Sequence, residues 1–431
     1  MTTQETAPAQ WSFAKRLGFR FVFSYFVLYY IPFPLDLIPF TGKVWTLWAR
    51  FWEHLVIWTG AHVLHLAQPI TYQPTGSGDT MHDYVLVFIS LVIAVAAAAV
   101  WSVLDRRRSS YFKLAGWMRV YLRYALAAIM LGYGFSKVFD LQFSPPGPST
   151  LMETYGASSP MGLAWTFMGY SVAYTVFAGA MECLGGILLL FRRTATLGAM
   201  VTAAVMVNVV MMNFCFDIPV KLYSVHLLLT AFVILGPSFG RLVDVLIFHR
   251  QTEPEDIRPP QWTGWRKWGR LSIKALLIGY VMLFANIKGN WEMWKMGHAP
   301  KGPLEGAYEV ESFCRNRVEV PPLVTDASRW RAIVVYPRVV AARGMDDKGK
   351  FFGYQADLVK GTLDLIDRSA PEPPKTPEGS FRLSWPDPAH LLLQGTFDGA
   401  PLEVLLKKKD ASDFPLMKRG FHWINEFPYN R

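Results

Sequence analysis

The sequence is poor in charge for its length. Of its 431 residues only 18% are charged, whereas 52% are hydrophobic, and soluble domains usually carry about 25% charged residues. This deficit excludes an ordinary soluble protein and indicates that lipid is part of the solvent. The formal net charge is still +10. Because the basic residues lie beside apolar stretches, they are typical of membrane-flanking loops, and we expect no nucleic-acid partner.

Cysteine is also scarce. The chain has three, Cys183, Cys215 and Cys314, and none forms a C-x-x-C pair, which excludes the usual motifs for an iron–sulfur cluster, a zinc site or a redox dithiol. Cys183 lies in an apolar stretch, where we expect it to pack. Cys215 and Cys314 are both expected near the outer side of a membrane, so a disulfide between them stays an open alternative.

Long apolar stretches are abundant and predict an α-helical polytopic membrane bundle of about seven transmembrane helices. Residues 84–104 carry no charge and would be about 31 Å long as a helix. Pro32, Pro34 and Pro39 should end or kink the first span early. Nothing at the N-terminus has the form of a signal peptide, so we expect that span to be retained. The expected spans are residues 21–40, 84–104, 117–139, 161–191, 194–216, 221–248 and 271–287.

Residues 44–66 are too polar to cross comfortably and predict an amphipathic helix at the membrane interface. This stretch holds His54, His62 and His65. Haem or metal ligation by them is one interpretation, and interfacial histidines that bind nothing are the one we favour. We therefore predict no metal site.

Dense basic clusters predict the orientation. Residues 106–108 and the pair Arg192 and Arg193 each follow a span. With a cytoplasmic N-terminus every dense basic cluster falls on the cytoplasmic side. We therefore expect a multi-pass protein of the cell inner (plasma) membrane whose C-terminal domain is extracytoplasmic.

The last third of the chain changes its period. Asp398 and Gly399 predict a hairpin turn. A small antiparallel β-barrel or sandwich is expected, and both stay open. Residues 419–431, rich in aromatic and charged side chains, are expected to add a last strand or to dock elsewhere. The runs that predict strands are residues 330–336, 351–358, 361–366, 381–385, 391–397 and 402–406.

Four parts of the chain follow from these patterns. Residues 1–116 are expected to form N-terminal transmembrane helices with the interfacial helix, and residues 117–248 a four-helix membrane unit. Residues 249–290 would be a cytoplasmic loop and the last transmembrane helix. Residues 291–431 would be an extracytoplasmic β-rich domain.

Ionisable and polar side chains inside the predicted spans form the candidate site, because such groups usually face a partner or a cavity. Glu182 lies nine residues before Phe191, about 13 Å deep and near the middle of the bilayer. Gly179, Gly185 and Gly186 beside it permit close helix approach. The other candidates are Arg123, Tyr133, Lys137, Asn208, Asn213, Asp217, Lys221 and His226.

Most of these candidates gather by depth toward the outer half of the bundle. They could bind the polar head of a lipid-soluble molecule such as a quinone, with His226 or Glu182 as proton acceptor. Alternatively, Glu182 pairs with Arg123 or Lys137 and sets the helix register. Proton transport is a third interpretation. No catalytic residue is assigned.

Residues 119–248 resemble the DoxX-like family of small four-helix membrane proteins. The resemblance rests on Arg123 and Lys137 with the glycines between them, on Met-Glu-Cys-Leu-Gly-Gly at 181–186, and on Asp-Ile-Pro-Val-Lys at 217–221. The whole layout is similar to larger bacterial members with added helices and an extracytoplasmic domain. This resemblance implies a redox-linked membrane role, since relatives include the membrane subunit of a thiosulfate:quinone oxidoreductase. The matched region lacks a dithiol, which argues against direct thiol chemistry.

Two functions are therefore open. In the first, the chain is a quinone-linked redox component that binds a lipid-soluble ligand in the outer half of its bundle. In the second, it is a non-catalytic membrane anchor or assembly protein whose extracytoplasmic β-domain docks a protein partner. A transporter is a weaker third alternative, because paired broken helices are not evident.

Overall fold

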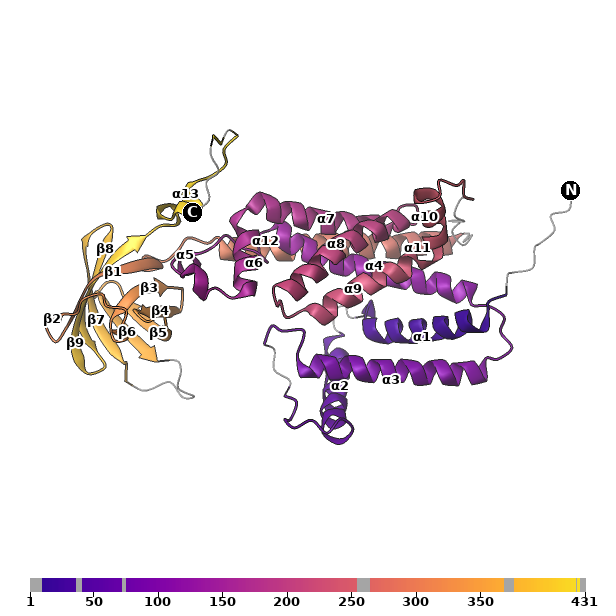
Figure 1. Cartoon of the computed structure of the whole chain (residues 1–431), viewed down its shortest axis with the longest axis horizontal. Coiled ribbons are helices and arrows are strands. Elements are labelled where there is room, and N and C mark those ends of the chain that lie inside the picture. The colour runs from indigo at the N-terminus through magenta and orange to yellow at the C-terminus, as the bar shows by residue number, and fades with distance from the viewer. Residues whose placement is uncertain are drawn as a thin grey trace. The chain divides into compact units, whose positions relative to one another are not determined.

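The chain forms two compact units in the computed structural model, which describes residues 10–35, 41–71, 75–253, 264–367, 376–423 and 425–426 (Figure 1). The helical unit comprises Met1–Phe143, Pro160–Ala164 and Val172–Trp294. The β unit comprises Ser144–Ser159, Trp165–Ser171 and Lys295–Arg431. The predicted fold class, a helical membrane bundle followed by a small antiparallel β domain, is confirmed.

Within the described residues, six helical stretches are long and apolar enough to cross a membrane, and the chain is therefore a multi-pass membrane protein. Four are single helices and two are composite. They are α3 (Met81–Leu104), α4 (Phe112–Val138), α7 (Val172–Leu190), α8 (Ala195–Cys215), the run of α9 (Lys221–Leu235), η3 (Gly236–Ser238) and α10 (Phe239–Leu246), and the run of α11 (Trp265–Ala275), the π-helical η4 (Leu276–Ala285) and α12 (Asn286–Gly297).

The first predicted span, residues 21–40, takes a different form. Helix α1 (Phe13–Tyr30) begins earlier and ends before Pro32, as the prolines predicted. It is not one of the six apolar stretches, because it contains three basic residues, Lys15, Arg16 and Arg20. One of them, Arg20, is buried and donates hydrogen bonds to the Tyr111 hydroxyl at 2.8 and 3.1 Å and to Ser102 Oγ at 2.7 Å. Residues 36–40 of the expected span lie outside the described residues, and α2 (Gly42–His62) follows them.

The expected span 161–191 is wrong as a single helix. Ser171 separates α6 (Pro160–Tyr170) from α7. At 1.5 Å per residue α6 is only about 16 Å long, too short to cross. Hydropathy misses this break because apolar residues continue on both sides, whereas Gly169 and Ser171 are poor helix formers. The crossing itself is made by α7.

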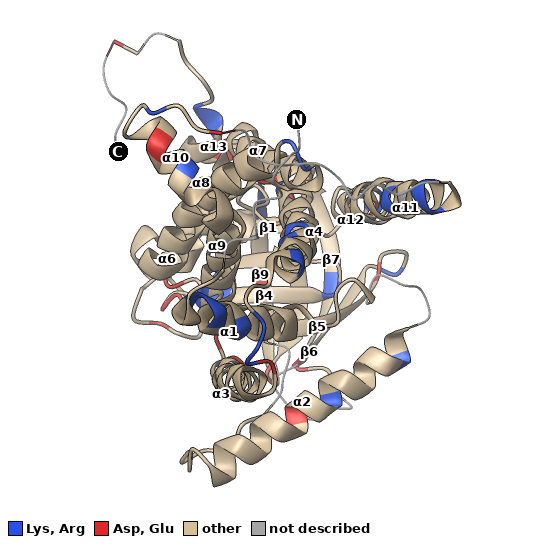
Figure 2. Ribbon diagram, turned by 90° about the vertical axis from the view of Figure 1, so that its right-hand side faces the viewer, with Lys and Arg blue, Asp and Glu red and all other residues tan. Residues whose placement is uncertain are grey.

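The basic ends of several helices meet at one end of the helical unit. At the start of α1, Arg16 donates to the Arg108 carbonyl just beyond α3 at 2.7 Å. At the start of α4, Arg119 donates to Thr196 Oγ1 on α8 at 3.2 Å and to Ser238 Oγ in η3 at 3.3 Å. Figure 2 marks further basic residues on α11. We call this the basic end of the helical unit.

At the opposite end of the helical unit, Asp79 connects the loop before α3 to the start of α9. Its carboxylate accepts hydrogen bonds from the backbone N–H groups of Lys221 at 2.8 Å and Leu222 at 2.9 Å. These are otherwise unsatisfied donors at the first turn of α9. The loop before α3 is therefore tied to the turn between α8 and α9.

The four helices α4, α7, α8 and α9 lie side by side in the order of the predicted four-helix unit (Figure 1). Helix α4 packs against α7 and α9, α7 against α8, and α8 against α9. Helix α1 packs against both α3 and α4. Their shared core contains residues with no exposed surface, including Leu122, Leu126, Leu131, Leu189 and Ile234.

The β unit is a closed barrel, which decides between the two predicted architectures. Its strands pair in antiparallel order β2-β1-β3-β4-β5-β6-β7-β8-β9, and β1 also pairs with β9. Strand β2 pairs only with the last two residues of β1, so the other eight strands form the wall in the described residues. Their bounds are β1 (Gly306–Arg315), β2 (Val318–Glu319), β3 (Trp330–Val335), β4 (Val339–Gly344), β5 (Gly349–Asp357), β6 (Thr362–Asp367), β7 (Gly379–Asp387), β8 (His390–Phe397) and β9 (Ala400–Lys409).

Alternating side chains fill the barrel interior. On β9, Leu402, Val404 and Leu406 point inward and are buried, as their period of two requires. Phe313 and Phe352 are almost wholly buried in the same core. An eight-stranded barrel is just wide enough to be filled by side chains. In the described residues, these buried side chains make the interior a packed hydrophobic core.

The hairpin prediction is confirmed and three strands were missed. Asp398 and Gly399 both have positive φ, 50° and 70°, and join β8 to β9 as a two-residue turn of type I′ requires. Strand β1 was missed because a bulge between Val310 and Ser312 interrupts its alternation. Strand β4 is rich in Ala and Gly, which are depleted in strands, and β2 has only two residues.

The C-terminal tail does not close the barrel, so the expected last strand is wrong for its described residues. Strand β9 already completes the wall by pairing with β1. After β9 the chain forms η5 (Ala411–Asp413) and α13 (Pro415–Lys418). Residue 424 and residues 427–431 lie outside the described part of the tail.

Neighbouring phenylalanines on β5 test the packing of the barrel. Phe352 is 0% exposed and Phe351 is 60% exposed. Phe352→Ala should lower barrel stability by about 3–5 kcal/mol, whereas Phe351→Ala should change it by less than about 0.5 kcal/mol. Hydrogen exchange of the strand amides in the full-length protein in detergent measures both. Equal protection in the two variants would contradict the packed interior.

Candidate functional site

A buried ion pair joins α4 to α7. Lys137 Nζ lies 2.8 Å from Glu182 Oε2, and the two residues are only 6% and 3% exposed. The ammonium also lies 5.6 Å from the ring centroid of Tyr133 and 5.8 Å from that of Phe143. Of the two partners considered for Glu182 from the sequence, Lys137 is confirmed.

Glycines close to this pair in the sequence, Gly134 on α4 and Gly179 on α7, allow the two helices to approach closely. A Cβ on Gly179 would lie 2.6 Å from the Gly134 carbonyl oxygen and 2.7 Å from Lys137 Cβ. A Cβ on Gly134 would lie 2.8 Å from the Gly179 carbonyl oxygen. All three distances are too short for a side chain at either position. The contact of small residues predicted from the sequence therefore brings the two charges within reach.

Arg123 and Asn208 lie apart from this pair. Arg123 is buried and donates two hydrogen bonds, of 2.9 and 2.7 Å, to the Leu189 carbonyl oxygen near the basic end of α7. Arg123 is thus not the partner of Glu182 in this structure. Asn208 is exposed on α8, where its amide nitrogen lies 3.9 Å from Met212 Sδ of the same helix.

Asn213, Asp217 and Lys221 form a separate group at the turn between α8 and α9. Lys221 Nζ lies 2.7 Å from Asp217 and 3.8 Å from Asp79. Asn213 is buried, and its amide lies 3.4 Å from the Val220 carbonyl oxygen. These contacts fix the turn and the start of α9.

His226 on α9 is held by α1. Its Nδ1 lies 2.6 Å from the Leu222 carbonyl oxygen, which can only accept, and its Nε2 lies 2.5 Å from the Tyr25 hydroxyl. A neutral imidazole therefore donates through Nδ1 and accepts from Tyr25 through Nε2. The Tyr29 ring stacks on the imidazole at 4.4 Å with an interplanar angle of 5°. The Tyr30 hydroxyl lies 2.8 Å from Thr230 Oγ1, one turn further along α9.

The tyrosines of α1 were missed by the sequence analysis. Tyr25, Tyr29 and Tyr30 were treated only as part of an apolar span. Their spacing places Tyr25 and Tyr29 on one face of the helix, next to prolines that end it. These tyrosines on one face near the end of the helix were the sequence signal that could have indicated a polar site.

A cavity of about 530 Å³ adjoins this stripe. We call it the aromatic cavity. Its walls are residues 29–33 from α1 and the turn after it, Ala125, Ala128 and Ile129 of α4, Tyr223 of α9, Met282 of η4 and Asn286 of α12. Among the described residues, the hydroxyls of Tyr29 and Tyr223 have no hydrogen-bond partner.

Tyr133 links the aromatic cavity to the ion pair. Its ring lies 6.2 Å from that of Tyr223, which lines the cavity, and it also faces the Lys137 ammonium. Of the candidates named from the sequence, Tyr133, Lys137 and Glu182 are therefore brought together. His226 does not line the cavity itself but stacks on Tyr29, which does.

Two of the three histidines predicted to be interfacial, His54 and His62, form hydrogen bonds within α2. His54 Nδ1 lies 2.7 Å from the Arg50 carbonyl oxygen, and His62 Nδ1 lies 3.0 Å from that of Trp58. Within the described ranges, no three His, Cys, Asp or Glu residues are grouped so as to hold a metal ion. Cys183, Cys215 and Cys314 are free thiols.

One curated protein similar to this chain is "Uncharacterized protein YwoB" from Bacillus subtilis (strain 168). It is 39% identical over 136 residues, which are 32% of this chain and 84% of YwoB. No family model matches the chain. No solved structure matches it either.

The ion pair gives a stability prediction. Lys137→Ala leaves Glu182 buried without its partner and should lower the stability of the helical unit by about 3–5 kcal/mol. The double change Lys137→Met with Glu182→Leu removes both charges and should recover most of that loss. Unfolding of the purified full-length protein in detergent measures both, with Asn208→Ala as an exposed control. Equal losses in the single and double variants would show that the charges do not stabilise this contact.

Proposed function

This chain belongs to the same family as YwoB of Bacillus subtilis, and from its own geometry we propose that its helical unit binds a lipid-soluble molecule with a polar head in the aromatic cavity. A quinone is the ligand class that fits best. The observation that carries the proposal is that two hydroxyls at one cavity of a membrane-spanning unit, those of Tyr29 and Tyr223, have no hydrogen-bond partner among the residues that the structure describes.

The size and lining of the cavity suit a planar ring. Small-molecule sites usually measure about 300–1,000 Å³ and combine apolar walls with a few polar groups. The aromatic cavity, at about 530 Å³, has tyrosine rings on one side and Ala125, Ala128 and Ile129 on another. Aromatic faces stack favourably on flat rings. A quinone head is flat, and its isoprenoid tail would remain in lipid.

The polar groups suit carbonyl oxygens. The Tyr29 and Tyr223 hydroxyls can each donate one hydrogen bond, and Asn286 adds an amide whose Nδ2 donates to the Met282 carbonyl at 3.0 Å. Carbonyl oxygens of a quinone only accept. The donors at the cavity and the acceptors of the ligand are therefore complementary.

Groups that can accept or donate a proton lie next to Tyr29 and near Tyr223. The His226 imidazole stacks on the Tyr29 ring at 4.4 Å between ring centroids. The Tyr133 ring lies 6.2 Å from that of Tyr223 and faces the Lys137 ammonium of the ion pair with Glu182. A bound quinone supplies two-electron, two-proton chemistry. The part of this chain would be to hold the ring and to keep proton acceptors near it. The resemblance to DoxX-like proteins is consistent with such a redox-linked role.

The basic end supports the proposed orientation. Arg16, Arg108 and Arg119 gather there from helices far apart in the sequence. By the positive-inside rule this end faces the cytoplasm. The aromatic cavity includes the C-terminal end of α1 and the first turn of α9, so it lies toward the other end. We therefore propose an inner-membrane protein with a ligand site in the outer half and an extracytoplasmic β unit.

Purified protein tests the proposal directly. We expect mass spectrometry of an organic extract from gently purified material to detect a quinone, and decylubiquinone to raise the melting temperature. Tyr29→Phe with Tyr223→Phe keeps both rings but removes both donors. At about 0.5–1.5 kcal/mol for each hydrogen bond, this double variant should bind roughly 5- to 150-fold more weakly.

Filling the cavity provides a second variant with a matched control. Ala128→Leu adds volume at the cavity wall, and Ala96→Leu adds the same volume on an exposed position of α3. Only the first should abolish the melting-temperature shift. If no quinone is extracted and none shifts the melting temperature, or if Ala128→Leu binds like the wild type, the proposal is wrong.

A second function, as a non-catalytic anchor or assembly protein, is favoured by the tail of the β unit. Phe421 and Trp423 contact each other at 5.1 Å between ring centroids, yet are 77% and 91% exposed. Aromatic residues are enriched in protein interfaces. These two side chains would dock a protein partner outside the cytoplasm.

Phe421→Ser with Trp423→Ser tests the anchor role. The double variant should lose a partner that co-purifies with the wild type, while Phe351→Ser, exposed on β5, should retain it. The same set of co-purifying proteins in both variants would contradict this role.

A further inference from the structure

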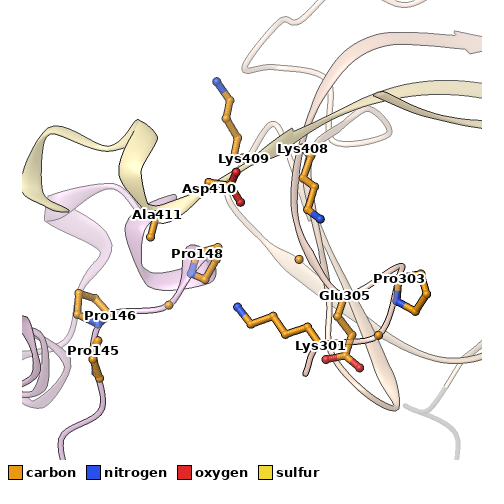
Figure 3. A pocket seen from close by; sticks show the side chains of 13 residues that line it. Pro145, Pro146, Pro148, Lys301, Pro303, Glu305, Lys408, Lys409, Asp410 and Ala411 are labelled. Carbon is orange, nitrogen blue, oxygen red and sulfur yellow. The ribbon is translucent and has the colours of Figure 1, made fainter. Parts of the chain in front are cut away.

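A second pocket, of about 440 Å³, lies within the β unit (Figure 3). One wall is the Pro145-Pro146-Gly147-Pro148 segment. The other is formed by the segment that begins at Lys301 and by the end of β9, with Lys408 and Lys409. Three lysines thus lie at one concave site, and we call it the lysine pocket.

Two of these lysines carry charge that nothing in the described part of the chain neutralises. Lys301 and Lys408 form no ion pair there. In Figure 3 the Lys301 side chain extends into the space between the walls, and the Lys408 side chain lies along the wall that holds Glu305. Lys409 points away and lies 2.9 Å from Glu309. The lysine pocket therefore has two ammonium groups available to a ligand.

Two acidic residues line the pocket, against three lysines. Asp410 lies at the N-cap of the short η5 helix, where its backbone N–H donates to Asp413 Oδ2 at 2.9 Å. Glu305 is the other carboxylate at the wall. The pocket is thus suited to an anion, with Glu305 placed to accept a hydrogen bond from a hydroxyl of the same ligand.

The proline wall is held in place before any ligand binds. Proline fixes its own φ angle, so the Pro145–Pro148 segment has little freedom to lose. Farther along the same segment, the Met152 carbonyl accepts hydrogen bonds from Arg331 at 3.1 Å and Arg343 at 3.5 Å, on β3 and β4. A preorganised wall lowers the entropic cost of binding.

We propose that the lysine pocket binds a phosphate group. Lysine ammonium groups bind phosphate as point charges, and two of them offset the charge of a phosphate monoester. Both walls adjoin membrane spans in the sequence: Pro145 lies seven residues after the end of α4, and Lys301 lies four residues after the end of α12. The phosphate can be borne by a lipid headgroup or can be free in solution. This site is independent of the aromatic cavity.

Calorimetric titration of the full-length protein in an uncharged detergent tests the lysine pocket with three probes. Dioctanoyl phosphatidic acid carries phosphate on a lipid, inorganic phosphate carries none of the lipid, and dioctanoylglycerol is the lipid without phosphate. Lys301→Gln with Lys408→Gln should weaken binding of the phosphate-bearing probe at least about tenfold. The control Lys348→Gln with Lys360→Gln removes the same charge from exposed positions of the barrel and should bind like the wild type.

The probes also identify the source of the phosphate. Binding of phosphatidic acid without binding of inorganic phosphate supports a lipid headgroup, and similar binding of both supports a soluble phosphate. The proposal is overturned if neither binds, if dioctanoylglycerol binds as well as phosphatidic acid, or if the Lys301/Lys408 variant and its control bind equally.

Discussion

The ion pair between Lys137 and Glu182 depends on the glycine contact between α4 and α7, and the arrangement of the helical unit depends on both. Gly134 and Gly179 remove the side chains that would hold the helices apart, so the two charges meet inside the unit instead of facing lipid. A lone charge there would be strongly unfavourable. The pair therefore favours one register of α4 against α7. Helices α8 and α9 then pack on that foundation.

The aromatic cavity follows from how α1 is held against these helices. Tyr25 bonds to His226 and Tyr30 to Thr230, so two polar contacts attach the end of α1 to α9. The chain must turn at Pro32, and Phe33 is kept near α4 because Tyr121 donates to its carbonyl at 3.0 Å. Tyr29 lies between these contacts, and its hydroxyl has no hydrogen-bond partner in the described part of the chain. The polar groups that position α1 are thus the groups that surround the proposed ligand.

Much of the fold could be predicted from local patterns, and the failures have local causes. Periodicity identified the apolar spans and six of the strands, since burial on one face imposes the period of each element. It failed at Ser171, where hydropathy continues through a break, and at β1, where a bulge interrupts the alternation. At the candidate site, Lys137 was one of the two partners predicted for Glu182, and Arg123 was the other. Periodicity did not find Tyr29 or the cavity, because nothing in α1 alone indicates which helix it packs against.

The sequence by itself determined that this chain spans a membrane several times and that its last third is a β domain. It also determined which ends of the spans are flanked by basic residues. These properties depend on composition and period, which are local. Only the tertiary structure decided which polar residues meet. Arg123 and Asn208 seemed equal to Glu182 as candidates, yet one bonds to a backbone carbonyl and the other lies exposed. Such partnerships join residues dozens of positions apart, and they depend on helix rotation and close approach, which a linear pattern does not contain.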